Sequence, residues 1–166
     1  MFKIGDTVVY GTEGVCTVTD ISKNDFSNME TERLYYILTP KSHNGGKIYV
    51  PCDNELLVSR MKNIMTKSEI KKIIKDDSII PQWIDDNRQR NRVFKDIIAT
   101  YDRKQIFGLA KLLCKVKKDS NGKRRLYASD EEILKKLLFI IFSELSLVIE
   151  IEYENVSDII LGEKSI

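Results

Sequence analysis

The fold of the N-terminal part of the chain is decided by residues 7–21, Thr7-Val8-Val9-Tyr10-Gly11-Thr12-Glu13-Gly14-Val15-Cys16-Thr17-Val18-Thr19-Asp20-Ile21. β-Branched residues, which favour strands, dominate both halves of this stretch. The glycines at its centre favour a turn. We therefore expect two strands joined by a turn at residues 11–14.

Two further strands are expected at residues 34–38 and 47–50, around a loop that contains Asn44-Gly45-Gly46. Pro51 ends the second of them. Several short strands with glycine-bearing turns favour a five-stranded, strongly bent sheet or small barrel. We expect this β domain to span residues 1–58 of an α+β protein.

The hydrophobic period changes from two to about 3.6 after Thr66, which predicts an all-helical domain over residues 59–166. Capping-box spacing occurs at Thr66–Glu69 and again at Ser129–Glu132. The expected helices begin at Lys67, run over 85–99, 104–116 and 133–148, and bury Ile70, Ile73, Phe94, Ile98, Leu109 and Leu113. Residues 149–154 alternate in polarity, so helix and strand both remain open there, with helix favoured.

Positive charge is concentrated in the middle of a nearly neutral chain. Residues 60–125 hold 19 Lys/Arg and 8 Asp/Glu, a net charge of +11, whereas residues 1–59 and 126–166 carry −3 and −6. Such a block favours a polyanion partner, because each neutralised phosphate releases condensed counterions. A solvated helix face is the alternative for any single one of these charges.

Within this block, Arg88, Arg92 and Lys95 share one face of the expected 85–99 helix, while Arg90 projects elsewhere. A second basic cluster surrounds the following turn. The candidate DNA-contacting residues are Trp83, Arg88, Arg90, Arg92, Lys95, Lys117, Lys118, Arg124 and Arg125. Trp83, the only tryptophan, is either a wedge or stacking platform for nucleic acid or a core side chain beside Pro81. Asp85 and Asp86 suit the free N–H groups at a helix start.

The sequence offers little for catalysis, and we expect no enzyme, metal site, cofactor or small-molecule substrate. The one histidine, His43, has no partner spaced for metal or nucleophilic chemistry and is expected in a solvated loop. Cys16, Cys52 and Cys114 are too far apart for a zinc site or disulfide framework and are expected as small buried hydrophobes. The first residues lack signal-peptide character and no long apolar stretch exists, so we expect a cytoplasmic protein without membrane contact.

The pattern Gly5-Asp6-Thr7-Val8-Val9-Tyr10, then Tyr35-Tyr36-Ile37-Leu38 and Ile48-Tyr49-Val50-Pro51, resembles the CarD/CdnL family of bacterial transcription regulators. Their N-terminal module is shared with the transcription-repair coupling factor. Trp83, the basic run Arg88 to Arg92 and the helix start Ala128-Ser129-Asp130-Glu131 extend the resemblance along the chain. One departure is Thr100-Tyr101-Asp102, where the family often has Ser-Gly-Asp.

The resemblance implies a Tudor-like module that binds the β subunit of RNA polymerase by strand pairing, with Val18, Tyr36, Ile48, Tyr49 and Val50 as contacts. It also implies a helical domain that contacts promoter DNA, without sequence specificity, at the upstream edge of the transcription bubble. There Trp83 would wedge into the minor groove and stabilise the open complex. The alternative is an adaptor that binds RNA polymerase and another acidic partner without a DNA wedge.

Overall fold

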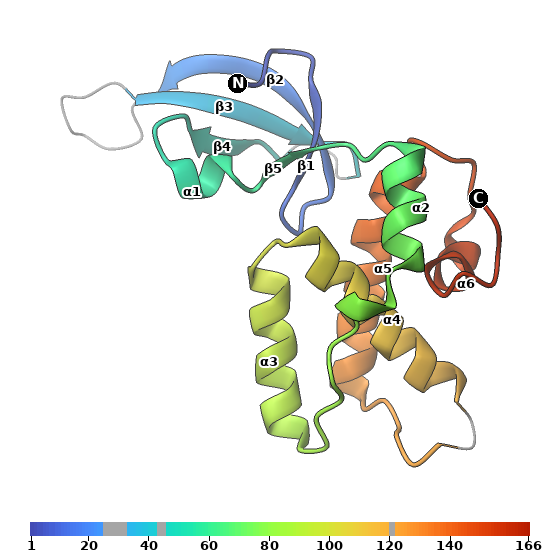
Figure 1. Cartoon of the computed structure of the whole chain (residues 1–166). Coiled ribbons are helices and arrows are strands. Elements are labelled where there is room, and N and C mark those ends of the chain that lie inside the picture. The colour runs from blue at the N-terminus through green and yellow to red at the C-terminus, as the bar shows by residue number, and fades with distance from the viewer. Residues whose placement is uncertain (25–32, 43–45, 120–121) are drawn as a thin grey trace. The chain divides into compact units, whose positions relative to one another are not determined.

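The computed structural model describes residues 1–24, 33–42, 46–119 and 122–166, and these divide into two compact units (Figure 1). Unit 1, Met1–Ile64, carries an antiparallel sheet, and unit 2, Met65–Ile166, is helical. The α+β prediction is therefore confirmed. His43, Asn44 and Gly45 of the expected loop lie outside the described residues.

Unit 1 contains β1 (Thr7–Tyr10), β2 (Val15–Asn24), β3 (Arg33–Pro40), β4 (Ile48–Pro51) and β5 (Met61–Asn63), in the sheet order β4-β3-β2-β1-β5. The predicted hairpin is present, with Val8 opposite Cys16. Its turn is closed by a 2.9 Å hydrogen bond from Tyr10 N to Gly14 O. Gly11 and Gly14 both have positive φ, so the turn needs the freedom that glycine has.

The boundary between the units lies later than residue 58, the boundary expected from the sequence. A short helix, α1 (Glu55–Val58), is capped by Asn54 and was not expected. The chain then returns as β5, which pairs with β1 and places Lys62 opposite Val9. Because β5 belongs to the sheet, residues 59–64 lie in unit 1, and their assignment to the helical domain is wrong. The sequence could not show this, since strand pairing across more than fifty residues has no local signal.

One apolar cluster holds the sheet together. Its buried members are Val8, Cys16, Val18, Tyr36, Leu38, Val50 and Met61. A register shift between Val18 and Asp20 interrupts the pairing of β2 with β3. Such a bulge increases the local twist of the strands, which accords with the bent sheet expected from the sequence.

Unit 2 contains α2 (Lys67–Lys75), the 3-10 helix η1 (Asp77–Ile79), α3 (Asn87–Ala99), α4 (Arg103–Lys118), α5 (Ala128–Leu145), the 3-10 helix η2 (Tyr153–Asn155) and α6 (Val156–Ile160). Helix α4 is the centre of the unit, because it contacts α2, η1, α3, α5 and α6 (Figure 1). Its residues from Ile106 to Cys114 are all buried. None of the described helices is long and apolar enough to cross a membrane.

The first predicted capping box is confirmed and the second is shifted. Thr66 accepts from Glu69 N, and Glu69 accepts from Thr66 N at 2.7 Å. In α5 the equivalent carboxylate is Asp130, which accepts from Tyr127 N at 2.9 Å, so Ser129 lies inside the helix rather than at its start.

Helix α5 also ends at Leu145, three residues before the expected end. Residues 149–152 form neither helix nor strand, so the favoured helix there is wrong. Ile149 and Ile151 instead pack against the core of the unit from an irregular segment.

The turn between α3 and α4 contains Tyr101 with φ of 55°, in the left-handed region that favours glycine. A side chain there costs roughly 1 kcal/mol in backbone strain. Asp102 follows and caps α4 by accepting from Gln105 N at 2.9 Å. The turn therefore keeps the geometry that the helix start needs although glycine is absent.

Two of the buried charged side chains of unit 2, Lys111 and Glu144, tie distant segments together. The ammonium of Lys111 on α4 donates to Asp76 O at 3.0 Å and to Ile74 O, which satisfies carbonyls at the end of α2. Glu144 on α5 accepts from Met65 N and from Arg103 Nη2, both at 2.8 Å. Buried charges are tolerated here because their hydrogen bonds are made.

Candidate functional site

Trp83 lies in the segment between η1 and α3 and is half-buried. Its ring meets Phe94 edge to face, with the ring centroids 6.5 Å apart. The guanidinium carbon of Arg90 lies 4.3 Å from the ring centroid. Trp83 is therefore anchored in the core of unit 2, while part of its side chain remains accessible. It is a core side chain on one side, as one alternative expected, and its accessible part leaves the wedge or stacking alternative open.

A hollow of about 560 Å³ opens beside this tryptophan, and we call it the Trp83 hollow. Apolar side chains, among them Ile80, Leu112 and Val116, form much of its lining. Lys115 and Arg124 add positive charge, and Asp119 adds one carboxylate. The hollow therefore combines an aromatic and apolar surface with cations.

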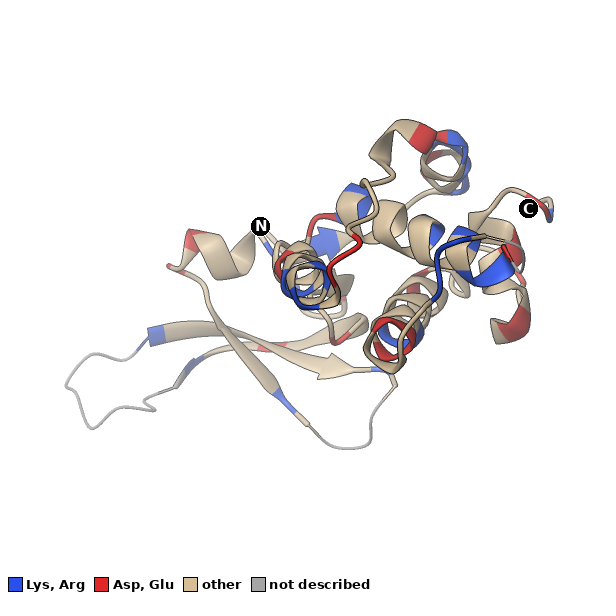
Figure 2. Ribbon diagram, turned by 90° about the horizontal axis from the view of Figure 1, so that it is seen from below, with Lys and Arg blue, Asp and Glu red and all other residues tan. Residues whose placement is uncertain are grey.

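A second hollow of about 400 Å³ shares Val116, Asp119 and Arg124 with the first. It adds Lys117 and Arg125 to the same surface, together with the carboxylate of Glu131. The segment before α5, which contains Arg124 and Arg125, forms an almost unbroken blue stretch in Figure 2. The structure thus brings four predicted residues together: Trp83, Lys117, Arg124 and Arg125.

Lys115 belongs to this surface and was not predicted from the sequence. It lies on α4 next to the buried Val116 and is half exposed, with its ammonium 3.5 Å from Asp77 Oδ2. A lysine on a helix face carries no signal that distinguishes it from a solvated charge. Only the approach of the segment 80–83 to α4 reveals its place beside Trp83.

The predicted stripe on α3 is exposed as expected. Arg88, Arg92 and Lys95 are all accessible, whereas Phe94 and Ile98 are buried on the other side of the helix. These three cations therefore form a surface separate from the core contacts of α3.

Arg90 does not belong to that surface, and its assignment as a DNA contact is corrected. Its side chain is fully buried and forms an ion pair with Asp130, from Nη2 to Oδ2 at 2.8 Å. The sequence showed that it projects away from the stripe but not that its carboxylate partner lies 40 residues along the chain.

Lys118 is exposed but already paired within unit 2. It forms ion pairs with Asp158, at 2.6 Å, and with Glu163. Hydrogen bonds to these two carboxylates raise the pKa of Lys118 to about 12. A phosphate would have to compete with two acidic partners, so Lys118 is a poorer candidate contact than its neighbour Lys117.

Asp85 and Asp86, the two acidic residues after Trp83, have different roles. Asp86 caps α3 by accepting from Gln89 N at 2.7 Å, as expected. Asp85 is exposed, and its backbone oxygen accepts from Arg90 Nη1 at 3.1 Å. One of the two carboxylates is therefore occupied by the helix start.

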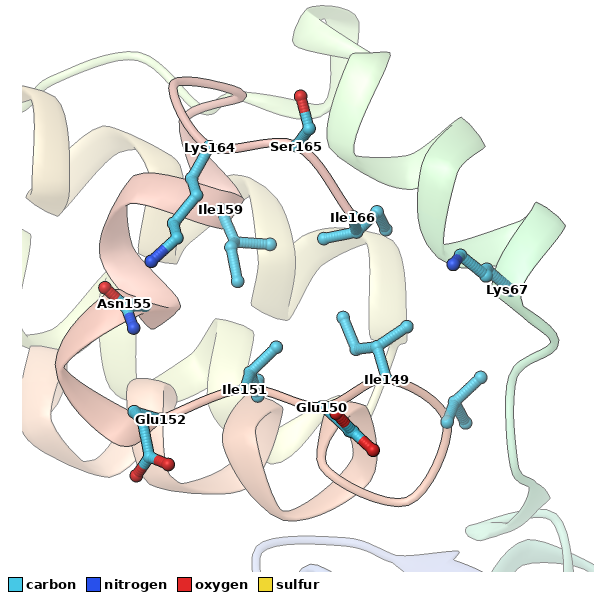
Figure 3. A pocket seen from close by; sticks show the side chains of 11 residues that line it. Lys67, Ile149, Glu150, Ile151, Glu152, Asn155, Ile159, Lys164, Ser165 and Ile166 are labelled. Carbon is cyan, nitrogen blue, oxygen red and sulfur yellow. The ribbon is translucent and has the colours of Figure 1, made fainter.

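A further hollow of about 560 Å³ lies away from the basic surface, between residues 148–155, the last residues of the chain and Lys67. Ile151, Ile159 and Ile166 point toward one another across it (Figure 3). Its lining contains Glu150 and Glu152 as well as Lys67 and Lys164. This balanced charge gives no preference for a polyanion.

In unit 1, the predicted polymerase contacts separate into buried and accessible residues. Val18, Tyr36 and Val50 are buried in the apolar cluster, so their side chains cannot meet a partner. The backbone of Val18 is also occupied, by Gly5 N and Asp6 O at 2.8 Å each. Tyr49 is 38% exposed and Ile48 is half-buried.

The sheet order restricts strand pairing to its edges. Within the described residues, β4 and β5 are the edge strands, and β2 and β3 are interior. The expectation of strand pairing at Val18 or Tyr36 is therefore corrected. The backbone of Val18 already bonds to Gly5 and Asp6, and Tyr35–Leu38 has β2 on one side and β4 on the other. Residues 48–51 of β4 remain as the candidate edge.

The three cysteines are free thiols, with Cys16 and Cys114 buried and Cys52 half-buried. Burial raises the pKa of Cys16 and of Cys114 to about 11, so both are protonated near neutral pH. Among the described residues, no group of three His, Cys, Asp or Glu side chains is placed to hold a metal ion.

Residues 2–62 match the family model of the CarD-like/TRCF RID domain, which covers nearly all of unit 1. Unit 1 is therefore similar, over almost its whole length, to the RNA polymerase-interacting domain that CarD-like proteins share with the transcription-repair coupling factor. No curated protein matches the chain significantly. The match indicates an RNA polymerase-interacting role for unit 1, and unit 2 lies outside the matched residues.

Proposed function

We propose that this protein is a non-enzymatic bacterial transcription regulator that binds the β subunit of RNA polymerase through unit 1. Unit 2 then stabilises the promoter open complex through sequence-nonspecific contacts at the upstream edge of the bubble. It acts in the cytoplasm, where the polymerase works. The observation that carries the DNA contact is the convergence of Trp83 with Lys115, Lys117, Arg124 and Arg125 on one surface.

The polymerase contact is supported by the edge position of β4 in a domain of the RNA polymerase-interacting family. An extended partner segment can add to such an edge through main-chain hydrogen bonds, with side chains giving specificity. The exposed ring of Tyr49 lies on this strand and packs against Tyr35, with ring centroids 6.4 Å apart. We therefore place the contact with the β subunit at β4.

The DNA contact is supported by the chemistry of the surface around Trp83. Cations bind phosphates regardless of base sequence, which suits a regulator that acts on many promoters. An aromatic ring inserted at a base step costs a few kcal/mol of unstacking, and less where the duplex is already opening. Tethering through unit 1 lowers the affinity that unit 2 needs on its own.

The adaptor function remains the second candidate, because Trp83 also packs on Phe94 and Arg90. The lifetime of promoter open complexes separates the two. Wild-type protein should lengthen it, and Trp83→Ala should remove the effect while polymerase binding is retained. Phe139→Ala, which removes an exposed aromatic ring from α5, is the matched control and should act like wild type.

A wild-type protein that binds polymerase without changing the lifetime would contradict the proposed function and favour the adaptor. Circular dichroism of Trp83→Ala must show a folded protein. If Trp83→Ala is folded and still lengthens the lifetime, the wedge role of Trp83 is refuted.

A further inference from the structure

Arg90 is the most heavily engaged buried side chain of unit 2. It is the fourth residue of α3 and has no exposed surface. Its guanidinium meets the carboxylate of Asp130 through two bonds, Nε to Oδ1 at 3.1 Å and Nη2 to Oδ2 at 2.8 Å. This bidentate geometry is the strongest form of an arginine–carboxylate pair.

The same guanidinium also binds the backbone directly after Trp83. Nη1 donates to Ile84 O at 2.8 Å and to Asp85 O at 3.1 Å, and Nη2 donates to Asn87 Oδ1 at 3.0 Å. Arginine has five N–H donors, and together with the two bonds to Asp130 each of them has an acceptor. The chain segment that follows Trp83 is thus held by one side chain.

The ring of Trp83 is held by that side chain as well. The guanidinium carbon lies 4.3 Å from the Trp83 centroid and 5.3 Å from the centroid of Tyr127. Asp130, for its part, accepts from the backbone N–H of Tyr127 at 2.9 Å. The start of α5, the side chain of Arg90 and the ring of Trp83 therefore form one connected group.

We propose that Arg90 is a positioning residue that orients Trp83 for its contact with DNA, and that Asp130 holds Arg90 in place. This inference rests on the proposed function for its consequence, but the orientation itself can be measured without DNA. Lysine cannot replace Arg90, because its three donors on a single atom cannot span both the carboxylate and the two carbonyls.

If the ion pair between Arg90 and Asp130 only supported the fold, its replacement by apolar side chains would leave the orientation of Trp83 unchanged. Apolar side chains of similar volume often replace a buried ion pair without loss of stability. The double variant Arg90→Met/Asp130→Leu is therefore expected to fold, yet it has no donor for Ile84 O and Asp85 O and no cation against the Trp83 ring. It separates the support of the fold from the orientation of Trp83.

Fluorescence quenching by acrylamide tests this directly, because Trp83 is the only tryptophan in the chain. The quenching constant should rise at least about two-fold in Arg90→Met/Asp130→Leu and in Arg90→Lys, since a released side chain samples solvent on the nanosecond scale. Circular dichroism should stay unchanged. Arg92→Met, an arginine two residues along α3 on its accessible stripe, is the control and should leave quenching as in wild type.

The effect on transcription follows in a second measurement. The lifetime of open complexes with Arg90→Lys should fall to the value found with Trp83→Ala. If the double variant does not fold, Arg90→Lys carries the test, because it keeps a cation opposite Asp130.

Unchanged quenching in a folded Arg90→Lys would overturn the positioning role, whatever the protein does on DNA. Increased quenching together with a wild-type protein that has no effect on open complexes would instead refute the proposed function and leave the orientation of Trp83 by Arg90 established. The two failures are therefore distinguishable.

Discussion

Gly108 of α4 packs so closely on Ile79 that a β-carbon at Gly108 would lie 2.0 Å from the carbonyl oxygen of Ile79. Neither group can yield easily, since one belongs to a buried helix and the other to backbone. The contact places η1 against α4, four residues before Trp83. Glycine is therefore required at position 108 by a close approach of two backbones.

Gly108→Ala should destabilise unit 2 by roughly 1–3 kcal/mol, the usual cost of overpacking, although alanine favours helix. Urea unfolding measures the change in stability. Because the displaced segment leads to Trp83, its fluorescence emission should also shift. Gly46→Ala, where the added carbon would meet no atom of the described residues within 4 Å, is the control. Equal stability of Gly108→Ala and wild type would contradict the close approach.

Protonation of Glu144 should make the free energy of unfolding depend on pH. Burial raises the pKa of Glu144 above its ordinary value of 4.5, although the charge of Arg103 opposes this. A pKa higher in the folded than in the unfolded chain means that the folded state holds the proton more tightly. The free energy of unfolding therefore falls as the pH rises from about 4.5 through the raised pKa.

The variant Glu144→Gln lacks the pH-dependent part of the unfolding free energy that comes from Glu144. Its amide oxygen can still accept from Met65 N and Arg103 Nη2. The difference in unfolding free energy, wild type minus variant, should thus decrease as the pH rises from about 4.5 to about 7. Denaturant titrations over this range measure it. A difference that increases with pH would show that the ion pair with Arg103 outweighs the cost of burial.

The cations beside Trp83 should control the salt dependence of binding to a polymerase–promoter complex. In the variant Lys117→Gln/Arg124→Gln/Arg125→Gln, the slope of log affinity against log salt should become shallower by about 0.9 for each phosphate that is no longer neutralised. Lys135→Gln/Lys136→Gln removes exposed charges of α5 that line neither basic hollow and should change the slope less. Equal slopes for both variants would contradict the assignment of the surface.

The edge strand β4 should carry the polymerase contact. Tyr49→Ala is expected to weaken binding to RNA polymerase by roughly 1–2 kcal/mol, because an exposed aromatic on an interface is a common source of binding energy. Lys62→Ala on the other edge strand, β5, should bind like wild type. Pull-down of RNA polymerase or its isolated β subunit compares them. If Lys62→Ala is the weaker binder, the contact lies at β5.

The local features of the chain could be predicted from its sequence. The hairpin around Gly11 and Gly14, the capping box at Thr66 and the cap of Asp86 depend on residues within a few positions of each other. The accessible stripe Arg88, Arg92 and Lys95 follows from helix periodicity. The similarity of the first strands to the RNA polymerase-interacting domain was also visible, since it depends on a contiguous pattern.

The tertiary structure decided which of the polar residues are surface and which are core. Arg90 and Asp130 are 40 residues apart, and Glu144 and Met65 are 79 apart. An arginine that binds phosphate and an arginine that clamps Trp83 have the same local sequence signal, and only packing brings a carboxylate to one of them. Helical and strand periods are set by neighbouring residues, whereas burial of a charge depends on partners that the folded chain alone assembles.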